Sequence, residues 1–248
     1  MGRLDNKVAI VTGGARNIGA VYARTLAAEG ARVVVADVLD GSAAAQAIRD
    51  AGGEAVHVEV DVSREDDTQR MAKTAMDAFG RIDVLVNNAA IYVSIQRRPF
   101  HEISAEEWDR VTAVNIKGVF LCAKAVFPHM RDQGGGRIIN ISSNTVMAGT
   151  PNFLHYVASK SALIGMTRSM AREMGAYGIG VNAIAPGLVE HEGQSLPPEL
   201  SASRVSARSV QRRQTPDDLT GTVLYLAASD SDFVTGQTLV VDGGDILY

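Results

Sequence analysis

Residues Ile138 to Lys160 read I-I-N-I-S-S-N-T-V-M-A-G-T-P-N-F-L-H-Y-V-A-S-K, and this stretch decides the fold. A strand is predicted over Arg137 to Ile141, because its near-continuous apolar run is typical of a parallel sheet buried on both faces. The helix predicted next carries Tyr156 and Lys160 on one face. An ammonium group beside a phenol favours the phenolate, so such a tyrosine can act as a general base. The same pair also suits a solvated helix face, so the rest of the chain must decide.

Strands and helices alternate along the whole chain. The other predicted strands are Lys7 to Val11, Arg32 to Ala36, Val56 to Val60, Asp83 to Val86, Gly180 to Ile184 and Thr238 to Val241. The predicted helices are Ile18 to Glu29, Ser42 to Ala51, Ser63 to Phe79, Ser104 to Arg131, His155 to Gly175 and a last one that opens at Thr215. This order predicts an α/β protein with a doubly wound parallel sheet of about seven strands and helices on both faces.

Local signals mark some helix starts and one irregular segment. Ser63 with Asp66, and Ser104 with Glu107, have the spacing of capping boxes. No linker or repeat interrupts the pattern, so residues 1–248 are interpreted as a single domain. Residues 188–214 are rich in Pro, Ser and Arg and directly follow a strand end, where ligands bind in such sheets. We therefore predict a substrate lid there.

Composition excludes several classes of protein. The chain has 248 residues, a net charge of −4 and no basic run, which argues against nucleic acid and anionic membranes as partners. The N-terminus lacks the apolar core of a signal peptide, and no apolar run was expected to reach the length of a membrane span. Cys122 is the only cysteine and is expected to be a buried, reduced thiol. A cytoplasmic protein is expected.

A glycine-rich turn and two carboxylates point to a nucleotide. The turn from Thr12 to Gly19 reads T-G-G-A-R-N-I-G and links a predicted strand to a predicted helix. Such a turn lets the backbone approach a pyrophosphate, although it also serves as a plain strand–helix connection. Asp37 ends the second strand, where a carboxylate binds a ribose diol and repels a 2′-phosphate. Asp61, at the end of the third strand, is placed to contact an adenine; for both residues a helix cap is the alternative.

Several further motifs follow in a fixed order. They are D61-V62, N87-N-A-A, Asn115, Ser143, Y156-V-A-S-K160, P186-G187 and D242-G-G. With the glycine-rich turn, they make the chain similar to the short-chain dehydrogenase/reductase family over almost its whole length. The resemblance implies a three-layer Rossmann-like fold, a nicotinamide cofactor, a homotetramer, and hydride transfer between an alcohol and its carbonyl.

The resemblance also implies roles for the matching residues. Tyr156 would be the catalytic acid/base, and Lys160 would lower its pKa and hold the nicotinamide ribose. Ser143, rather than Ser142, has the family spacing to Tyr156 and would orient the substrate oxygen. Asn115 would kink its helix and hold a water of the proton relay. The implied cofactor-binding residues, besides Tyr156 and Lys160, are Gly13, Arg16, Asn17, Ile18, Gly19, Asp37, Asp61, Val62, Asn88, Ala89, Pro186, Gly187 and Val189.

The chain departs from the family pattern at three positions. Asn17 replaces the usual second glycine of the turn, but Asn tolerates left-handed backbone better than most residues. Ala90 replaces the glycine of N-N-A-G. His191 stands where the family often has a threonine that contacts the nicotinamide. Glu190 and Glu192 flank His191, but three adjacent residues make a poor coordination shell, so no metal is expected.

The substrate is predicted less closely than the chemistry. The candidate substrate-binding residues are Tyr92, Thr145, Phe153 and His191, with Val146, Met147 and Leu188 as further wall residues. Some stretches resemble the pyridoxal 4-dehydrogenase and 1-phenylethanol dehydrogenase types, which suggests an aromatic or cyclic alcohol. Asp37 favours NAD, whereas Arg16 supports the alternative of an NADPH-dependent biosynthetic ketoreductase similar to 3-oxoacyl reductases. A non-catalytic, nucleotide-binding redox sensor is a third interpretation, although it need not keep Ser143, Tyr156 and Lys160 together.

Overall fold

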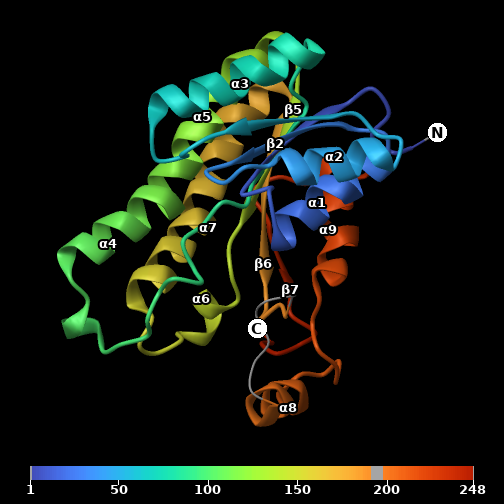
Figure 1. The fold of residues 1–248 in the computed structure, drawn as a ribbon. Helices are drawn as coiled ribbons and strands as arrows, with labels where there is room; N and C mark the ends of the chain where they lie inside the picture. Colours follow the sequence, from blue (N-terminus) through green and yellow to red (C-terminus); the bar gives the residue numbers. More distant parts are fainter. Residues whose placement is uncertain (1, 191–197, 248) are drawn as a thin grey trace.

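A parallel sheet of seven strands runs through the computed structural model, which describes residues 2–190 and 198–247 (Figure 1). The strands are β1 (Val8–Thr12), β2 (Arg32–Asp37), β3 (Ala55–Glu59), β4 (Val84–Asn87), β5 (Gly136–Ile141), β6 (Ile179–Pro186) and β7 (Thr238–Val241). Their order across the sheet is β3-β2-β1-β4-β5-β6-β7, and every pair is parallel. The predicted doubly wound α/β fold is confirmed.

Helices cover both faces of the sheet (Figure 1). One face carries α1 (Asn17–Ala28), α2 (Ser42–Asp50) and α9 (Thr220–Ala227), and the other carries α3 (Glu65–Phe79), α5 (Gly118–Asp132) and α7 (Leu154–Met174). Each parallel connection must cross over the sheet, and a right-handed crossover helix packs back onto it. The connections from β1 to β3 run in one direction across the sheet and those from β3 to β6 run in the other, so α1 and α2 lie on one face and α3, α5 and α7 on the opposite face.

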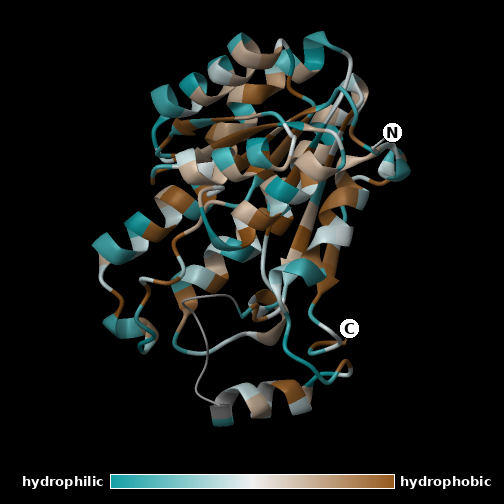
Figure 2. Cartoon of the chain, turned by 45° about the vertical axis from the view of Figure 1, so that its right-hand side comes forward, coloured by the Kyte–Doolittle hydropathy of each residue, from teal (hydrophilic) through white to brown (hydrophobic). Residues whose placement is uncertain are grey.

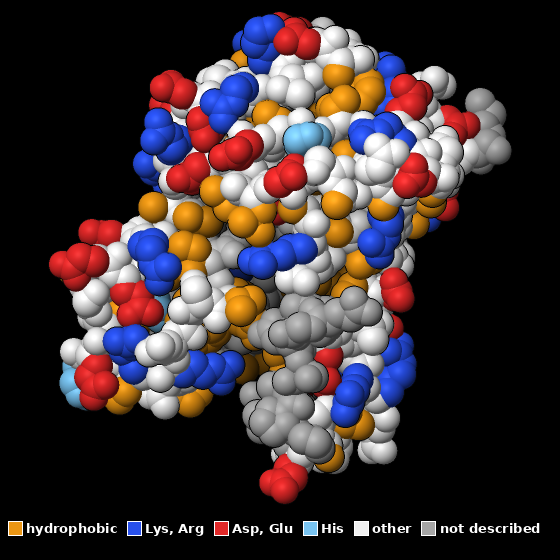
Figure 3. Space-filling view, in the orientation of Figure 1, with side chains coloured by type: hydrophobic (Ala, Val, Ile, Leu, Met, Phe, Trp, Pro, Cys, Tyr) orange, Lys and Arg blue, Asp and Glu red, His pale blue; other side chains and the backbone are white. Residues whose placement is uncertain are grey.

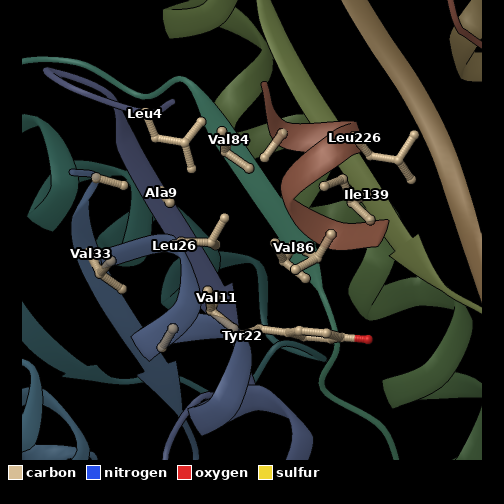
Figure 4. Close-up of a cluster of buried hydrophobic side chains, with 14 of the residues drawn as sticks. Leu4, Ala9, Val11, Tyr22, Leu26, Val33, Val84, Val86, Ile139 and Leu226 are labelled. Atoms are coloured by element: carbon tan, nitrogen blue, oxygen red, sulfur yellow. The ribbon is translucent and has the colours of Figure 1, made fainter. Parts of the chain in front are cut away.

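Strand β1 shows why the strands read as apolar runs. Val8 and Ile10 belong to the core cluster under α3 and α5, whereas Ala9 and Val11 belong to the cluster under α1 and α9 (Figure 4). Successive strand residues point to opposite faces, so both faces need apolar side chains. Each fully buried Val or Ile contributes about 1.5–3 kcal/mol relative to exposure. Figure 2 shows the same pattern, with hydrophobic strands and hydrophilic outer helix turns.

The long helical region predicted from Ser104 to Arg131 is present as one continuous stretch with a π-helical turn inside it. It consists of α4 (Ala105–Thr112), a π-helical turn at Ala113–Lys117, and α5. Ser104 Oγ accepts a hydrogen bond from Glu107 N at 3.1 Å, so the predicted cap is present. The Glu107 carboxylate, however, lies against His155 Nε2 at 3.3 Å instead of returning to the cap.

The capping box predicted at Ser63 and Asp66 is wrong. Helix α3 begins at Glu65, after a cap residue, Arg64, that makes no side-chain bond. Ser63 instead donates from its N and Oγ to Asp61 Oδ1, at 2.9 and 2.7 Å. The carboxylate two residues earlier competes for the serine and forms a local turn. By contrast, Thr215 N donates to Asp218 Oδ2 at 2.8 Å and opens the 3₁₀ turn before α9, as predicted.

The segment predicted as an irregular lid contains a helix, α8 (Pro198–Ala207). Residues 191–197 of that segment lie outside the described part of the chain. The two sides of the segment meet in a parallel bridge between Val189 and Gln214, where Glu190 N donates to Gln214 O at 2.9 Å. Arg208 Nη2 also donates to Leu188 O at 2.9 Å. The segment therefore leaves the sheet after β6 and returns beside it.

One expectation from composition needs correction. Among the described residues, the helical stretch Ala105–Asp132 is long and apolar enough to cross a membrane by length and composition alone. Half of its apolar window is buried inside the protein, as in the core helix of a soluble protein. The prediction that no apolar run reaches this length failed because α4 and α5 continue through the π turn as one stretch.

On the face shown in Figure 3, Lys and Arg side chains alternate with Asp and Glu, which gives no single-sign patch.

Candidate active site

A cavity of about 500 Å³ lies beside the carboxyl ends of the strands. Its walls come from the loops that follow β1 to β6, because parallel strands deliver all their carboxyl ends to one edge of the sheet. The cavity includes Gly13 after β1 and Asn88 after β4, the two strands between which the strand order reverses. This reversal point is where open α/β sheets bind ligands. Its volume is in the range of small-molecule and cofactor sites.

The glycine-rich turn forms one end of the cavity. Gly13 has a φ of 64° and Asn17 a φ of 52°, so Asn17 adopts the left-handed backbone that its residue type tolerates. A Cβ at Gly19 would lie 2.0 Å from Gly13 O, so only glycine permits this approach of turn and helix. Asn88 Nδ2 donates to Thr12 O and Gly13 O at 3.0 and 3.1 Å, which ties the turn to the loop after β4. The exposed backbone at the start of α1 fits a pyrophosphate.

Two carboxylates flank that end. Asp37 is buried and lines the cavity; its Oδ2 accepts from Ala15 N and its Oδ1 from Leu39 N, both at 3.0 Å. These two bonds fix the carboxylate while each oxygen keeps a free lone pair. Asp61 also lines the cavity, but its Oδ1 is taken by Ser63. The backbone donors of the turn and the acceptor carboxylates beside it therefore fit a dinucleotide.

Residues from β5 and α7 form the other end. Ser142 Oγ donates to Lys160 O at 2.9 Å, and Lys160 Nζ donates to Ile141 O at 2.7 Å. These bonds join the end of the strand to the helix and turn Ser142 away from Tyr156. Ser143 remains, and its Oγ accepts from Thr145 Oγ1 at 3.0 Å. The structure thus brings Ser143, Tyr156 and Lys160 to one wall of the cavity.

Burial governs the ionisation of this wall. Burial raises the pKa of Tyr156 above its ordinary value, Tyr92 adds to this increase, and a hydrogen bond with Ser143 opposes it. Burial also lowers the pKa of Lys160, to about 8. The predicted lowering of the Tyr156 pKa by Lys160 is not seen in this structure. The ammonium donates to the end of β5 and lies 5.7 Å from the centre of the phenol ring.

Asn115 supports the wall from behind. It is buried, belongs to the π-helical turn and does not line the cavity. Its Oδ1 accepts from Ile91 N at 2.8 Å, and its Nδ2 donates to Ile91 O and Ser159 Oγ, both at 3.1 Å. The kink expected at this residue is present as the π turn. Its side chain ties the loop after β4 to α7, so it fixes Tyr156 indirectly.

Three aromatic rings pack together at the substrate end. Phe153 stacks on Tyr156 with ring centres 4.6 Å apart, and Tyr92 lies 5.2 Å from Tyr156 with its ring tilted by 54°. Tyr92 and Thr145 line the cavity as predicted. Phe153 does not line the cavity, because it is buried against the Tyr156 ring, and this corrects its prediction as a wall residue. The Val146 and Met147 side chains also lie outside the lining.

All the cofactor-binding residues implied by the resemblance line this cavity, while His191 lies outside the described residues. Leu188, predicted as a wall residue, lines it too. Sequence reasoning did not assign the remaining lining residues to the site. They are Val38, Leu39, Val60, Ala90, Ile91, Val93, Arg97, Val114, Asn144, Ala148, Thr150 and Asp245, together with Ser142 and Ile141. Some of them, such as Asp245 directly after D242-G-G, adjoin motif positions, and that proximity was the signal that could have identified them. Arg97 adjoins no motif.

Comparison with known proteins agrees with this geometry. A family model described as enoyl-(acyl carrier protein) reductase matches residues 13–245. A 3-alpha-(or 20-beta)-hydroxysteroid dehydrogenase of Mycobacterium tuberculosis is 41% identical over 99% of this chain and 91% of its own length. A 3-oxoacyl-[acyl-carrier-protein] reductase of Synechocystis is 38% identical over the full length of both chains. The crystal structure of a protein provisionally named a short-chain alcohol dehydrogenase, from Sinorhizobium meliloti, superposes with a TM-score of 0.92, at 32% identity, over 98% of this chain and 97% of that chain.

The buried Lys160 amine should give stability a measurable pH dependence. Its folded pKa of about 8 lies below the ordinary 10.5, so the unfolded chain binds more protons between these values and stability rises with pH. Relative to Lys160→Met, the unfolding free energy of the wild type should increase by about 2 kcal/mol between pH 7.5 and pH 9.5. Urea unfolding at several pH values measures this difference. As a control, the difference in unfolding free energy between the wild type and Lys124→Met, a change at an exposed lysine, should stay constant with pH. A constant difference for Lys160→Met would contradict the prediction.

Proposed function

Because the chain belongs to the short-chain dehydrogenase/reductase family and is an oxidoreductase acting on CH–OH groups, we propose that it oxidises an aromatic or cyclic secondary alcohol with NAD. The single observation that carries this proposal is the convergence of Ser143, Tyr156 and Lys160 on the cavity that also holds the glycine-rich turn and Asp37. The steroid named by one relative is itself a cyclic alcohol. The aromatic side chain of Tyr92, beside Tyr156, supports a flat or ring-shaped substrate.

The residues of the wall divide the proton chemistry between them. The nicotinamide, when bound, supplies the hydride acceptor or donor. Ser143 is placed to hydrogen-bond the reacting oxygen of the substrate. Tyr156 takes the hydroxyl proton in oxidation and returns a proton in reduction. Burial raises the pKa of its phenol, so the positive charge of Lys160 and of oxidised nicotinamide is what would favour the phenolate during turnover.

A second function is supported by a specific observation. One relative is named a 3-oxoacyl-[acyl-carrier-protein] reductase, and Arg16 lines the cavity near the glycine-rich turn. Both favour a ketoreductase that uses NADPH, because a guanidinium can pair with a 2′-phosphate. Relatives named as dehydrogenases and reductases argue against the non-catalytic redox sensor. Asp37 makes the NAD-dependent dehydrogenase the preferred proposal.

Catalysis should depend on the phenol of Tyr156. Tyr156→Phe should lower kcat by about 100- to 10,000-fold, because it removes the proton-transfer group while the ring still packs on Phe153. Cofactor binding should remain, as followed by quenching of protein fluorescence. Lys160→Ala should impair both turnover and cofactor binding. Near-normal turnover by Tyr156→Phe would sink the assignment of the acid/base.

Cofactor choice should follow Asp37. NAD should exceed NADP in kcat/KM by about tenfold or more, because a fixed carboxylate binds ribose hydroxyls and repels a phosphate, and tenfold requires only about 1.4 kcal/mol. Asp37→Ser should reduce this ratio, with Arg16 then free to pair the 2′-phosphate. Asp40→Ser is the matched control, since Asp40 is exposed and does not line the cavity. A wild type that prefers NADP, or a ratio untouched in Asp37→Ser, would refute this account.

We also propose a homotetramer, as the family resemblance implies. Exposed apolar side chains support it: Phe120 on α5, Leu154 on α7 and Trp108 on α4 are 50%, 45% and 37% exposed. Two of these three helices, α4 and α7, pack against each other. Multi-angle light scattering at micromolar concentration should give four times the chain mass of 26.3 kDa. A monomer would contradict the proposal.

A further inference from the structure

Arg97 stands in the cavity wall without an assigned role. It lies in the loop between β4 and α4, and it lines the cavity. The loop is tied down on both sides of it. Ile95 N donates to Tyr92 O at 3.1 Å, and Arg98 N donates to Asn152 O at 3.0 Å. The position of Arg97 beside the substrate end is therefore set by backbone bonds.

The guanidinium of Arg97 is also oriented. Its central carbon lies 4.9 Å from the centre of the Phe153 ring, a cation–π contact. Phe153 in turn stacks on Tyr156 at 4.6 Å. The Arg97 guanidinium and the Tyr156 ring thus both contact the buried ring of Phe153. The cation–π contact uses the charge of the guanidinium and none of its N–H donors, which stay available to bind a ligand.

Arg97 differs from the other cations along the described cavity lining and from its neighbour Arg98 in its surroundings. Of the other cations there, Arg16 lies at the turn and Lys160 donates to the end of β5. Arg98, the next residue, lies 3.6 Å from the Glu107 carboxylate. Within the described residues no carboxylate comes within ion-pair distance of Arg97. An unpaired cation at the mouth of a partly apolar cavity attracts an anion.

We infer that the substrate carries a carboxylate on the side of its ring opposite the reacting alcohol, and that Arg97 binds it. This inference rests on the proposed oxidation of an aromatic or cyclic alcohol. The planar fork of the guanidinium matches the two oxygens of a carboxylate. With the alcohol carbon at Tyr156 and the carboxylate at Arg97, the ring of the substrate lies beside Tyr92. Arg97 is then a specificity-determining residue that positions the substrate through its remote end.

The test compares two alcohols that share the reacting alcohol and the ring, the anion 4-(1-hydroxyethyl)benzoate and its uncharged methyl ester. The wild type should prefer the acid. Arg97→Met should lower kcat/KM for the acid by about 10- to 100-fold, the range for hydrogen bonds to a charged group, mainly through KM. Turnover of the ester should persist in Arg97→Met, which shows that the variant is folded. Arg97→Lys should retain part of the preference, because it keeps the charge but loses the fork.

Arg98→Met is the matched control, because the substitution removes the same charge from the same loop and Arg98 does not line the cavity. It should keep the wild-type ratio of acid to ester. Equal use of the two alcohols by the wild type, or a ratio unchanged in Arg97→Met, would overturn the inference alone. Failure of the wild type to oxidise either alcohol would overturn the proposed substrate class and the inference with it.

Discussion

Two hydrogen bonds between the end of β5 and α7 hold the site together. Lys160 Nζ donates to Ile141 O, and Ser142 Oγ donates back to Lys160 O. These bonds fix the position of α7 relative to the end of β5, and Tyr156 therefore lies beside Ser143. Both bonds are buried, and losing either partner leaves a polar group unsatisfied at a cost of about 1–3 kcal/mol. The position of the catalytic wall is thus a property of the core.

The same burial sets the resting chemistry of the wall. It raises the pKa of Tyr156 and lowers that of Lys160, so in both cases burial opposes charge. A neutral phenol packed against Phe153 and Tyr92 is stable in the core but is a poor base. The positive charge of an oxidised nicotinamide would favour the phenolate, so Tyr156 would become a better base only when the cofactor is bound. The aromatic stack therefore links packing with reactivity.

Much of the fold was predictable because its signals are local and repeated. Buried parallel strands must be apolar on both faces, so runs such as β1 and β5 are recognisable without knowledge of their partners. Errors arose where side chains compete. Ser63 has the spacing of a cap but bonds to Asp61 instead. Phe153 was predicted as a wall residue because it lies close to Tyr156 in sequence. It directly precedes α7, and its side chain is buried in the core. The helix α8 has no strong periodic signal.

The sequence by itself determined the alternation of strands and helices, the glycine-rich turn, and the spacing of Ser143, Tyr156 and Lys160. These are patterns within single elements, fixed by the periods of strand and helix. Only the tertiary structure decided that the Ser142 hydroxyl bonds to the backbone of Lys160, that Asn115 ties a loop to α7, and that the Arg97 guanidinium lies over the Phe153 ring beside the site. Those facts depend on contacts between loops from different strands, whose relative positions are set by sheet packing and by no local sequence period.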